Sequence, residues 1–197
     1  MLRRILLLAT SLMFTQAAFG EYISMDLYTQ KQSQWCWAAV SQTVRDNNQN
    51  FFRLQCKMAS AMHTPSYSST YCCGSNNYYE NNTYSSSSTI GSRCNKPNST
   101  QRALEWNNVY QKTISGPGSS TEIAKQLSFN DPVVVSVGWD SGGGHAMVIY
   151  GANTRGIAGA TYNLWNPGRG RGSETIHHSS LRRYRNSGTW RTTYFTN

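Results

Sequence analysis

The stretch Gln30–Val40, with the sequence QKQSQWCWAAV, places Cys36 between two tryptophans. A polar, glutamine-rich run precedes the cysteine, and a small apolar run follows it. The apolar side predicts a helix over residues 36–46, with Val40 and Val44 four residues apart on one face. At a helix N-terminus, unpaired backbone N–H groups and the helix dipole lower the pKa of a thiol. The stretch therefore suggests a nucleophile, although an ordinary buried cysteine fits it equally well.

The N-terminus has the three-part pattern of a secretory signal peptide. A basic start, Met1–Arg4, is followed by a mostly apolar run over residues 5–14 and by small residues at 17–20. A membrane anchor is the alternative, but this apolar run is shorter than the roughly 20 residues that a span requires. We therefore expect residues 1–20 to be a signal peptide, and the mature protein to be periplasmic or extracellular, without stable membrane insertion.

The cysteines of an exported protein are expected to pair, because the environment is oxidising. The sequence has five cysteines, so one thiol must stay free. Cys36 stands apart and is the expected free thiol, whereas the disulfide candidates cluster in a polar segment: Cys56, Cys72, Cys73 and Cys94. Adjacent cysteines rarely bond each other, so either Cys56–Cys72 with Cys73–Cys94 or Cys56–Cys73 with Cys72–Cys94 is possible. The adjacent pair lacks the CxxC spacing of common zinc sites, so we expect no metal and no cofactor.

The pattern along the chain changes from helical to β near residue 129. Helices are predicted at residues 36–46, 51–62, 100–110 and 120–127. Strands are predicted at residues 133–137, 146–151, 162–165 and 189–195. We expect residues 21–197 to form one α+β domain, in which a disulfide-bridged helical half, about residues 21–128, packs against an antiparallel β half, about residues 129–197. The natural place for a site is the cleft between the two halves.

A thiol nucleophile needs a base within hydrogen-bond reach and a third group that orients this base. Of the four histidines, His145 is the best candidate for the base, because it follows three glycines and opens an apolar strand. A structural strand histidine is the alternative. Asn166, which ends the predicted strand at 162–165, is the candidate for the orienting group, because its side-chain carbonyl can accept from an imidazole. An Asn–Pro turn is the plainer explanation of Asn166, and Asp140 is a rival that is too close to His145 in sequence to reach around its ring.

The oxyanion of an acyl-transfer intermediate needs hydrogen-bond donors. The backbone N–H of Cys36 is one candidate, and a side-chain amide would supply another. Gln30, Gln32 and Gln34 all precede Cys36 on the polar side of the stretch. The remaining histidines are expected at the surface or at a helix end: His63, His177 and His178.

Positive charge is in excess, with a formal net charge of +9, and the excess lies late in the chain. The arginines concerned are Arg169, Arg171, Arg182, Arg183, Arg185 and Arg191. A nucleic-acid partner is one explanation of such charge, but no nucleic-acid motif accompanies it. We therefore favour a solvated basic face and expect no nucleic-acid partner; acidic substrates or anionic cell surfaces are compatible with this face.

In order and spacing, Gln30, the Cys36–Trp37 pair, His145 and Asn166 resemble the papain-like cysteine peptidases. The closer resemblance is to a bacterial branch of that family, which includes the AvrRpt2-type effectors. Similarities to that branch cover most of residues 30–194 and include the segments Gln34–Ala39, Cys72–Cys73 with Cys94–Asn95, Gly142–Ala146 and Gly188–Trp190. The chain departs from the branch at Asn166, where an aspartate is usual, although papain itself uses asparagine. It also lacks the Cys-Gly-Ser spacing before the nucleophile of papain.

The resemblance implies a papain-like fold and a secreted cysteine endopeptidase that acts on a protein or peptide substrate. Cys36 would be the nucleophile, His145 the base and Asn166 the group that orients the base, while Gln30 would complete the oxyanion hole. The same residues could instead serve an amidase, a deamidase or a transglutaminase-like acyl transferase. A non-catalytic secreted binding or effector module is a further alternative. We expect the protein to be a monomer.

Overall fold

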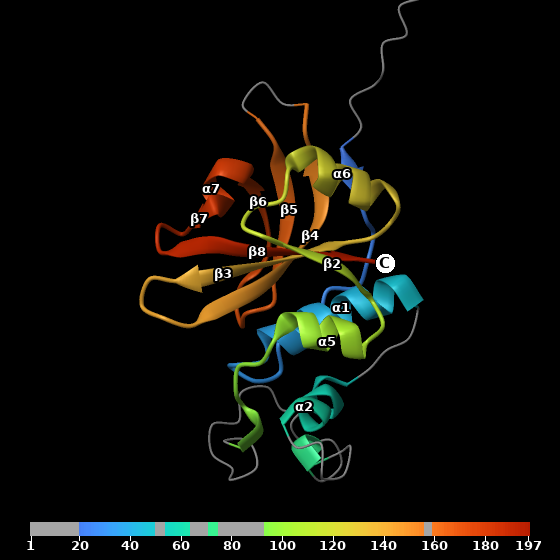
Figure 1. The fold of residues 1–197 in the computed structure, drawn as a ribbon, viewed down its shortest axis with the longest axis vertical. Coiled ribbons are helices and arrows are strands. Elements are labelled where there is room, and N and C mark those ends of the chain that lie inside the picture. Colours follow the sequence, from blue (N-terminus) through green and yellow to red (C-terminus); the bar gives the residue numbers. More distant parts are fainter. Residues whose placement is uncertain (1–19, 50–53, 64–70, 75–92, 156–158) are drawn as a thin grey trace, which may run out of the picture.

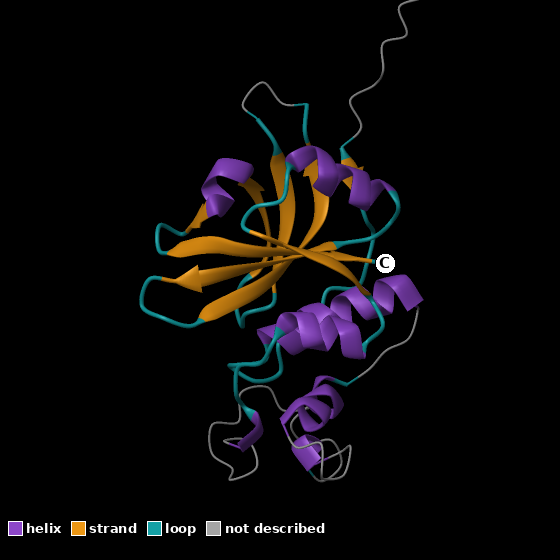
Figure 2. Cartoon of the chain, in the orientation of Figure 1, coloured by secondary structure: helices purple, strands orange, loops and turns teal. Residues whose placement is uncertain are grey.

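The computed structural model describes residues 20–49, 54–63, 71–74, 93–155 and 159–197. The expected signal peptide, apart from Gly20, and the start of the second predicted helix at 51–53 lie outside the described residues. None of the described helices is long and apolar enough to cross a membrane. The expected α+β class is confirmed, since helices pack beside an antiparallel sheet (Figures 1 and 2).

Among the described residues, the helices are α1 (Cys36–Gln49), α2 (Gln55–His63), the 3₁₀ turn η1 (Tyr71–Cys73), α5 (Thr100–Trp106), α6 (Ser120–Ser128) and α7 (His178–Arg182). The strands are β1 (Glu21–Tyr22), β2 (Tyr110–Ser115), β3 (Val133–Trp139), β4 (Gly144–Asn153), β5 (Thr161–Asn166), β6 (Gly172–His177), β7 (Arg183–Tyr184) and β8 (Gly188–Thr196). All four predicted strands are present, at β3, β4, β5 and β8. The elements β2, β6 and α7 were not predicted.

The sheet has the strand order β2-β8-β3-β4-β5-β6, and every pair in it is antiparallel. The short strand β1 pairs with the end of β4, and β7 pairs with β8. The chain thus enters the sheet at β1, leaves it for α1, α2 and α5, and returns at β2. Two strands from residues 21–128 therefore belong to the sheet.

Both faces of the central strands are buried, which explains why β3 reads as a continuous apolar run. Val133 and Val135 pack on one face in a cluster that also contains Leu181 of α7. Val134 points to the other face and packs with Val40 of α1. In Figure 1, α6 and α7 accordingly lie above the sheet, and α1, α2 and α5 lie below it.

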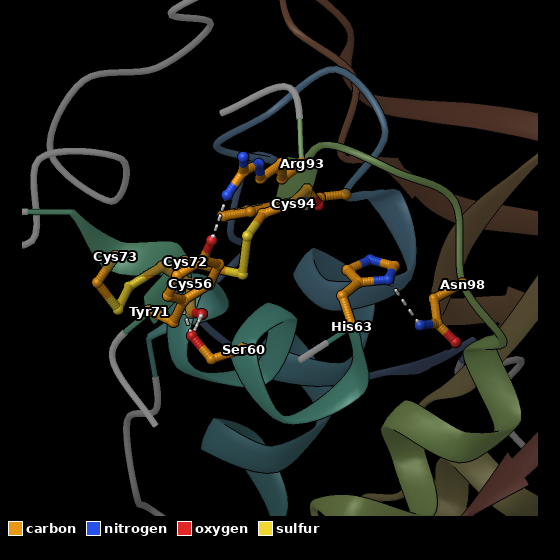
Figure 3. The surroundings of a disulfide bond; sticks show 10 residues. Cys56, Ser60, His63, Tyr71, Cys72, Cys73, Arg93, Cys94 and Asn98 are labelled. Atoms are coloured by element: carbon orange, nitrogen blue, oxygen red, sulfur yellow. Dashed lines mark hydrogen bonds between the residues drawn. A yellow bond between two sulfur atoms is a disulfide. The ribbon is translucent and has the colours of Figure 1, made fainter. Parts of the chain in front are cut away.

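Two disulfides join α2, η1 and the segment before α5 (Figure 3). They connect Cys56 with Cys73 and Cys72 with Cys94, which is one of the two pairings that the sequence left open. All four cysteines are buried in a small second core. Two disulfides are typical of proteins that fold outside the cytoplasm.

Candidate active site

Cys36 is the first residue of α1 and the free cysteine of the chain. Cys36 is half-buried. Burial raises the pKa of its thiol and outweighs the backbone N–H groups of Ala146, Trp37 and Cys36 itself, which lower that pKa. The lowered pKa expected from the helix N-terminus is therefore not found, because burial outweighs it, and the thiol needs a base to become a nucleophile.

The loop before Cys36 is held by the disulfide-bonded segment around Cys94. The indole Nε1 of Trp35 donates to the carbonyl of Cys94 at 2.8 Å, and that of Trp37 donates to the carbonyl of Lys96 at 3.2 Å. The two tryptophans that flank the cysteine are thus anchored to a segment about 60 residues away in sequence. Their role is to fix the position of the thiol.

His145 is the second residue of β4, and its imidazole is tied to β5. Nε2 of His145 lies 2.8 Å from Oδ1 of Asn166. The same oxygen accepts from the backbone N–H of Gly168 at 3.0 Å, which identifies it as the oxygen of the carboxamide. Nε2 therefore carries the proton in neutral His145, and Nδ1 is its basic nitrogen.

Burial lowers the pKa of His145, and it does so more than any other influence. The hydrogen bond to Asn166 opposes this shift, while the charges of Arg171 and Arg185 add to it. A lowered histidine pKa beside a raised thiol pKa favours a neutral imidazole and a neutral thiol in the free protein.

Three residues that could not be identified from the sequence lie around His145 and Asn166: Trp139, Glu174 and Tyr184. Nδ2 of Asn166 donates to the hydroxyl of Tyr184 at 2.9 Å, and that hydroxyl donates to Glu174. The indole of Trp139 stacks on His145, with ring centroids 6.4 Å apart, and also contacts the ring of Tyr184. Together these contacts hold the imidazole and the carboxamide of Asn166 in place.

Cys36 and His145 line the same pocket, which has a volume of about 370 Å³. A second pocket of about 280 Å³ is also lined by His145, together with Asn166 and three arginines, Arg169, Arg171 and Arg185. His145 therefore borders two hollows of the surface. Positive charge next to His145 favours anionic groups in the second hollow. A larger cavity, of about 640 Å³, lies elsewhere, beside His178.

Gln30 is buried, and its amide nitrogen donates to the carbonyls of Gln32 at 2.9 Å and Ser33 at 2.7 Å. Both of its amide protons are thus used to brace the loop before Cys36. Its backbone N–H donates to Pro167 at 2.9 Å, which ties this loop to the turn after Asn166. Gln34, by contrast, is exposed and lines the pocket with Cys36.

The remaining candidates lie apart from the pair. Asp140 is exposed and forms a salt bridge with Arg183. His63 ends α2 and contacts Asn98, with 3.4 Å between its Nδ1 and the amide nitrogen (Figure 3). His177 is exposed. His178, expected at the surface, is half-buried and bonded to Tyr162.

No protein-family model matches the sequence, and a search of curated proteins finds no match either. Among solved structures, the chain is similar to the Pseudomonas avirulence protein AvrPphB, with 15% identity and a TM-score of 0.26 over 49% of this chain and 57% of that chain. It is also similar to the bromelain protease of Ananas comosus in complex with the E64 inhibitor, with 13% identity and a TM-score of 0.40 over 87% of this chain and 94% of that chain. Neither similarity is strong enough to indicate a function for this chain.

Proposed function

We propose that the mature chain is an exported, papain-like cysteine endopeptidase. The observation that supports this most is the hydrogen bond between Nε2 of His145 and Oδ1 of Asn166, on a histidine that also lines a pocket together with Cys36. This bond makes Nδ1 the basic nitrogen, as a general base for the thiol requires. Five cysteines, of which four are bridged, add a free thiol at the start of a helix.

The first step is the transfer of the thiol proton of Cys36 to Nδ1 of His145. The resulting thiolate attacks the carbonyl carbon of the scissile peptide bond and forms a tetrahedral intermediate. Asn166 accepts from Nε2–H throughout and stabilises the imidazolium, because its carbonyl dipole points at the new charge.

The imidazolium then gives its proton to the leaving amine, and the C–N bond breaks. A thioester on Cys36 remains. Water attacks the thioester after giving a proton to Nδ1 of His145, and the carboxylic acid product leaves as the thiol is restored. Formation of the thioester and its hydrolysis use only the residues of the site and one water molecule.

The oxyanion of both intermediates requires donors at the start of α1. The backbone N–H of Cys36 is one, and Gln34, which is exposed and lines the pocket with Cys36, offers a side-chain amide as the other. Gln30 contributes to the oxyanion hole by holding the loop that carries both donors. We expect Gln34→Ala to lower kcat with little change in thermal stability, and Gln30→Ala to lower both.

The proposal is tested with purified mature protein, residues 21–197, and an unbiased peptide library analysed by mass spectrometry. Wild-type protein is expected to cut internal peptide bonds, and Cys36→Ala to cut none while keeping its melting temperature. Release of ammonia without cuts would indicate an amidase instead of an endopeptidase, and cross-linking of added amines without cuts would indicate an acyl transferase. If none of these reactions occurred in a protein with one reactive thiol, the interpretation as a non-catalytic binding module would be favoured.

A further inference from the structure

The carboxamide of Asn166 is held at both of its polar atoms. Oδ1 faces two donors, the backbone N–H of Gly168 at 3.0 Å and Nε2 of His145 at 2.8 Å. Because a backbone N–H can only donate, Nδ2 must be the atom that faces the hydroxyl of Tyr184, 2.9 Å away. Asn166 is 4% exposed and Tyr184 is 1% exposed, so a mismatched pair of atoms here could not turn to water.

The hydroxyl of Tyr184 has one proton, and this proton is directed at the carboxylate of Glu174. A carboxylate can only accept, so Tyr184 has to donate to it. The guanidinium of Arg185 lies 3.7 Å from Glu174 and over the ring of Tyr184, with 5.2 Å between its central carbon and the ring centroid. The Tyr184 oxygen thus accepts from Nδ2 of Asn166, and its proton faces an acceptor.

We infer that Tyr184 and Glu174 are positioning residues for His145, and that their hydrogen-bond chain requires an amide rather than a carboxylate at position 166. An aspartate there could still accept from His145 and Gly168. Its second oxygen, however, would face the oxygen of Tyr184, whose proton is already engaged by Glu174. The lone pairs of an aspartate oxygen and of the Tyr184 oxygen would then face each other in a buried place, which would destabilise the folded state.

This inference rests on the proposed function only in that Asn166 orients His145. The direction of this hydrogen-bond chain is set by Glu174, so the direction can reverse only when position 174 carries an amide and position 166 a carboxylate. An amide at position 174 can accept or donate. With a carboxylate at 166, it can donate to the oxygen of Tyr184, whose proton then turns to position 166.

The test is a set of substitutions in the mature chain. Asn166→Asp alone should lower kcat and the alkylation rate of Cys36 about tenfold or more, because buried oxygens are left unmatched. Glu174→Gln alone should lower both about two- to fivefold, because a neutral amide is a weaker acceptor than a carboxylate. The double variant should react about threefold or more faster than Asn166→Asp alone, so that the same change at 174 harms one background and helps the other.

Two controls separate this effect from a general change of charge or stability. Glu122→Gln removes a carboxylate on α6 that pairs with Lys112, and it should not rescue Asn166→Asp. Tyr184→Phe removes the hydroxyl between the two positions, and it should abolish the rescue by Glu174→Gln. The melting temperature should follow the same pattern as the alkylation rate.

The alkylation rate and the melting temperature need no peptide substrate, so they decide this inference even if the wild-type protein cleaves nothing. In that case the proposed function fails and the reversal at position 174 can still be observed. Equal losses from Glu174→Gln in both backgrounds would overturn the inference, as would wild-type kcat and melting temperature for Asn166→Asp.

Discussion

Oδ1 of Asn166 lies 2.8 Å from Nε2 of His145 and thereby leaves Nδ1 as the basic nitrogen of the imidazole. Because burial raises the pKa of the Cys36 thiol, the reactivity of this thiol near neutral pH should depend on that nitrogen. His145→Ala is therefore expected to slow alkylation of Cys36 by iodoacetamide at pH 7 about tenfold or more. The exposed His177 provides the matched control, and His177→Ala should react at the wild-type rate. Equal rates for all three proteins would argue against a proton transfer from Cys36 to His145.

The stability of the fold should fall on acidification below pH 6.5, the usual histidine pKa. Burial lowers the pKa of His63, His145 and His178, so the folded state binds fewer protons than the unfolded state just below that pH. The stability that comes from these neutral rings is fully present above pH 6.5 and is lost as the pH falls toward their folded-state pKa values. Urea unfolding at pH 7.5 and pH 5.5 measures the change.

His178→Gln should reduce this pH dependence, because it removes one of the three groups. A free energy of unfolding that stays constant or rises between pH 7.5 and 5.5 would contradict the prediction.

The disulfide pairing can be tested by counting thiols. The native protein should show one reactive thiol, Cys36, and the reduced, unfolded protein should show five. Removing one bridge as a pair, with Cys72→Ser and Cys94→Ser together, should leave the count at one, because Cys56 and Cys73 still pair. The loss of stability should be about 2–4 kcal/mol. A count of three in this variant would support the alternative pairing.

Gly188 lies against the indole that covers His145. A Cβ at this position would stand 2.7 Å from Cζ3 of Trp139, which is closer than real contacts allow. Gly188→Ala should therefore displace the indole, destabilise the fold by about 1–3 kcal/mol and lower kcat. Tryptophan fluorescence and peptide cleavage would both report the shift.

Gly116 offers a control for loss of stability alone. It has a φ of +79° and open space at its Cβ position, so Gly116→Ala adds backbone strain of about 1–2 kcal/mol without a steric clash. This variant should lose stability and keep its kcat. If both glycine variants lost kcat in proportion to stability, Trp139 would have no separate effect on the site.

The sequence predicted those parts of the fold whose signal is local. The apolar runs at β3 and β4 were visible because both faces of these strands are buried, and α1 was visible from Val40 and Val44. The segment Gly172–His177 was not predicted as a strand, because it lies at the end of the sheet, where its side chains alternate between exposed and half-buried. Such a strand carries too few apolar residues to be distinguished from a turn.

From the sequence, the site could be predicted only where the type of a residue and its neighbours indicate its chemistry. Cys36 was marked by odd cysteine parity, and His145 by the glycines before it. Nothing in the sequence marks Tyr184 or Glu174, because their importance comes from hydrogen bonds that form when β5, β6 and β7 meet. The expected lowering of the Cys36 pKa was wrong for a related reason, since burial depends on the whole fold.

The disulfide between Cys72 and Cys94 also affects how firmly the loop before Cys36 is held. The carbonyl of Cys94 and that of Lys96 are the acceptors that hold the tryptophans on each side of Cys36. A freshly synthesised, reduced chain lacks this clamp, so we expect its nucleophile loop to stay loose. The redox state of the surroundings would then determine how firmly the thiol of Cys36 is held in place.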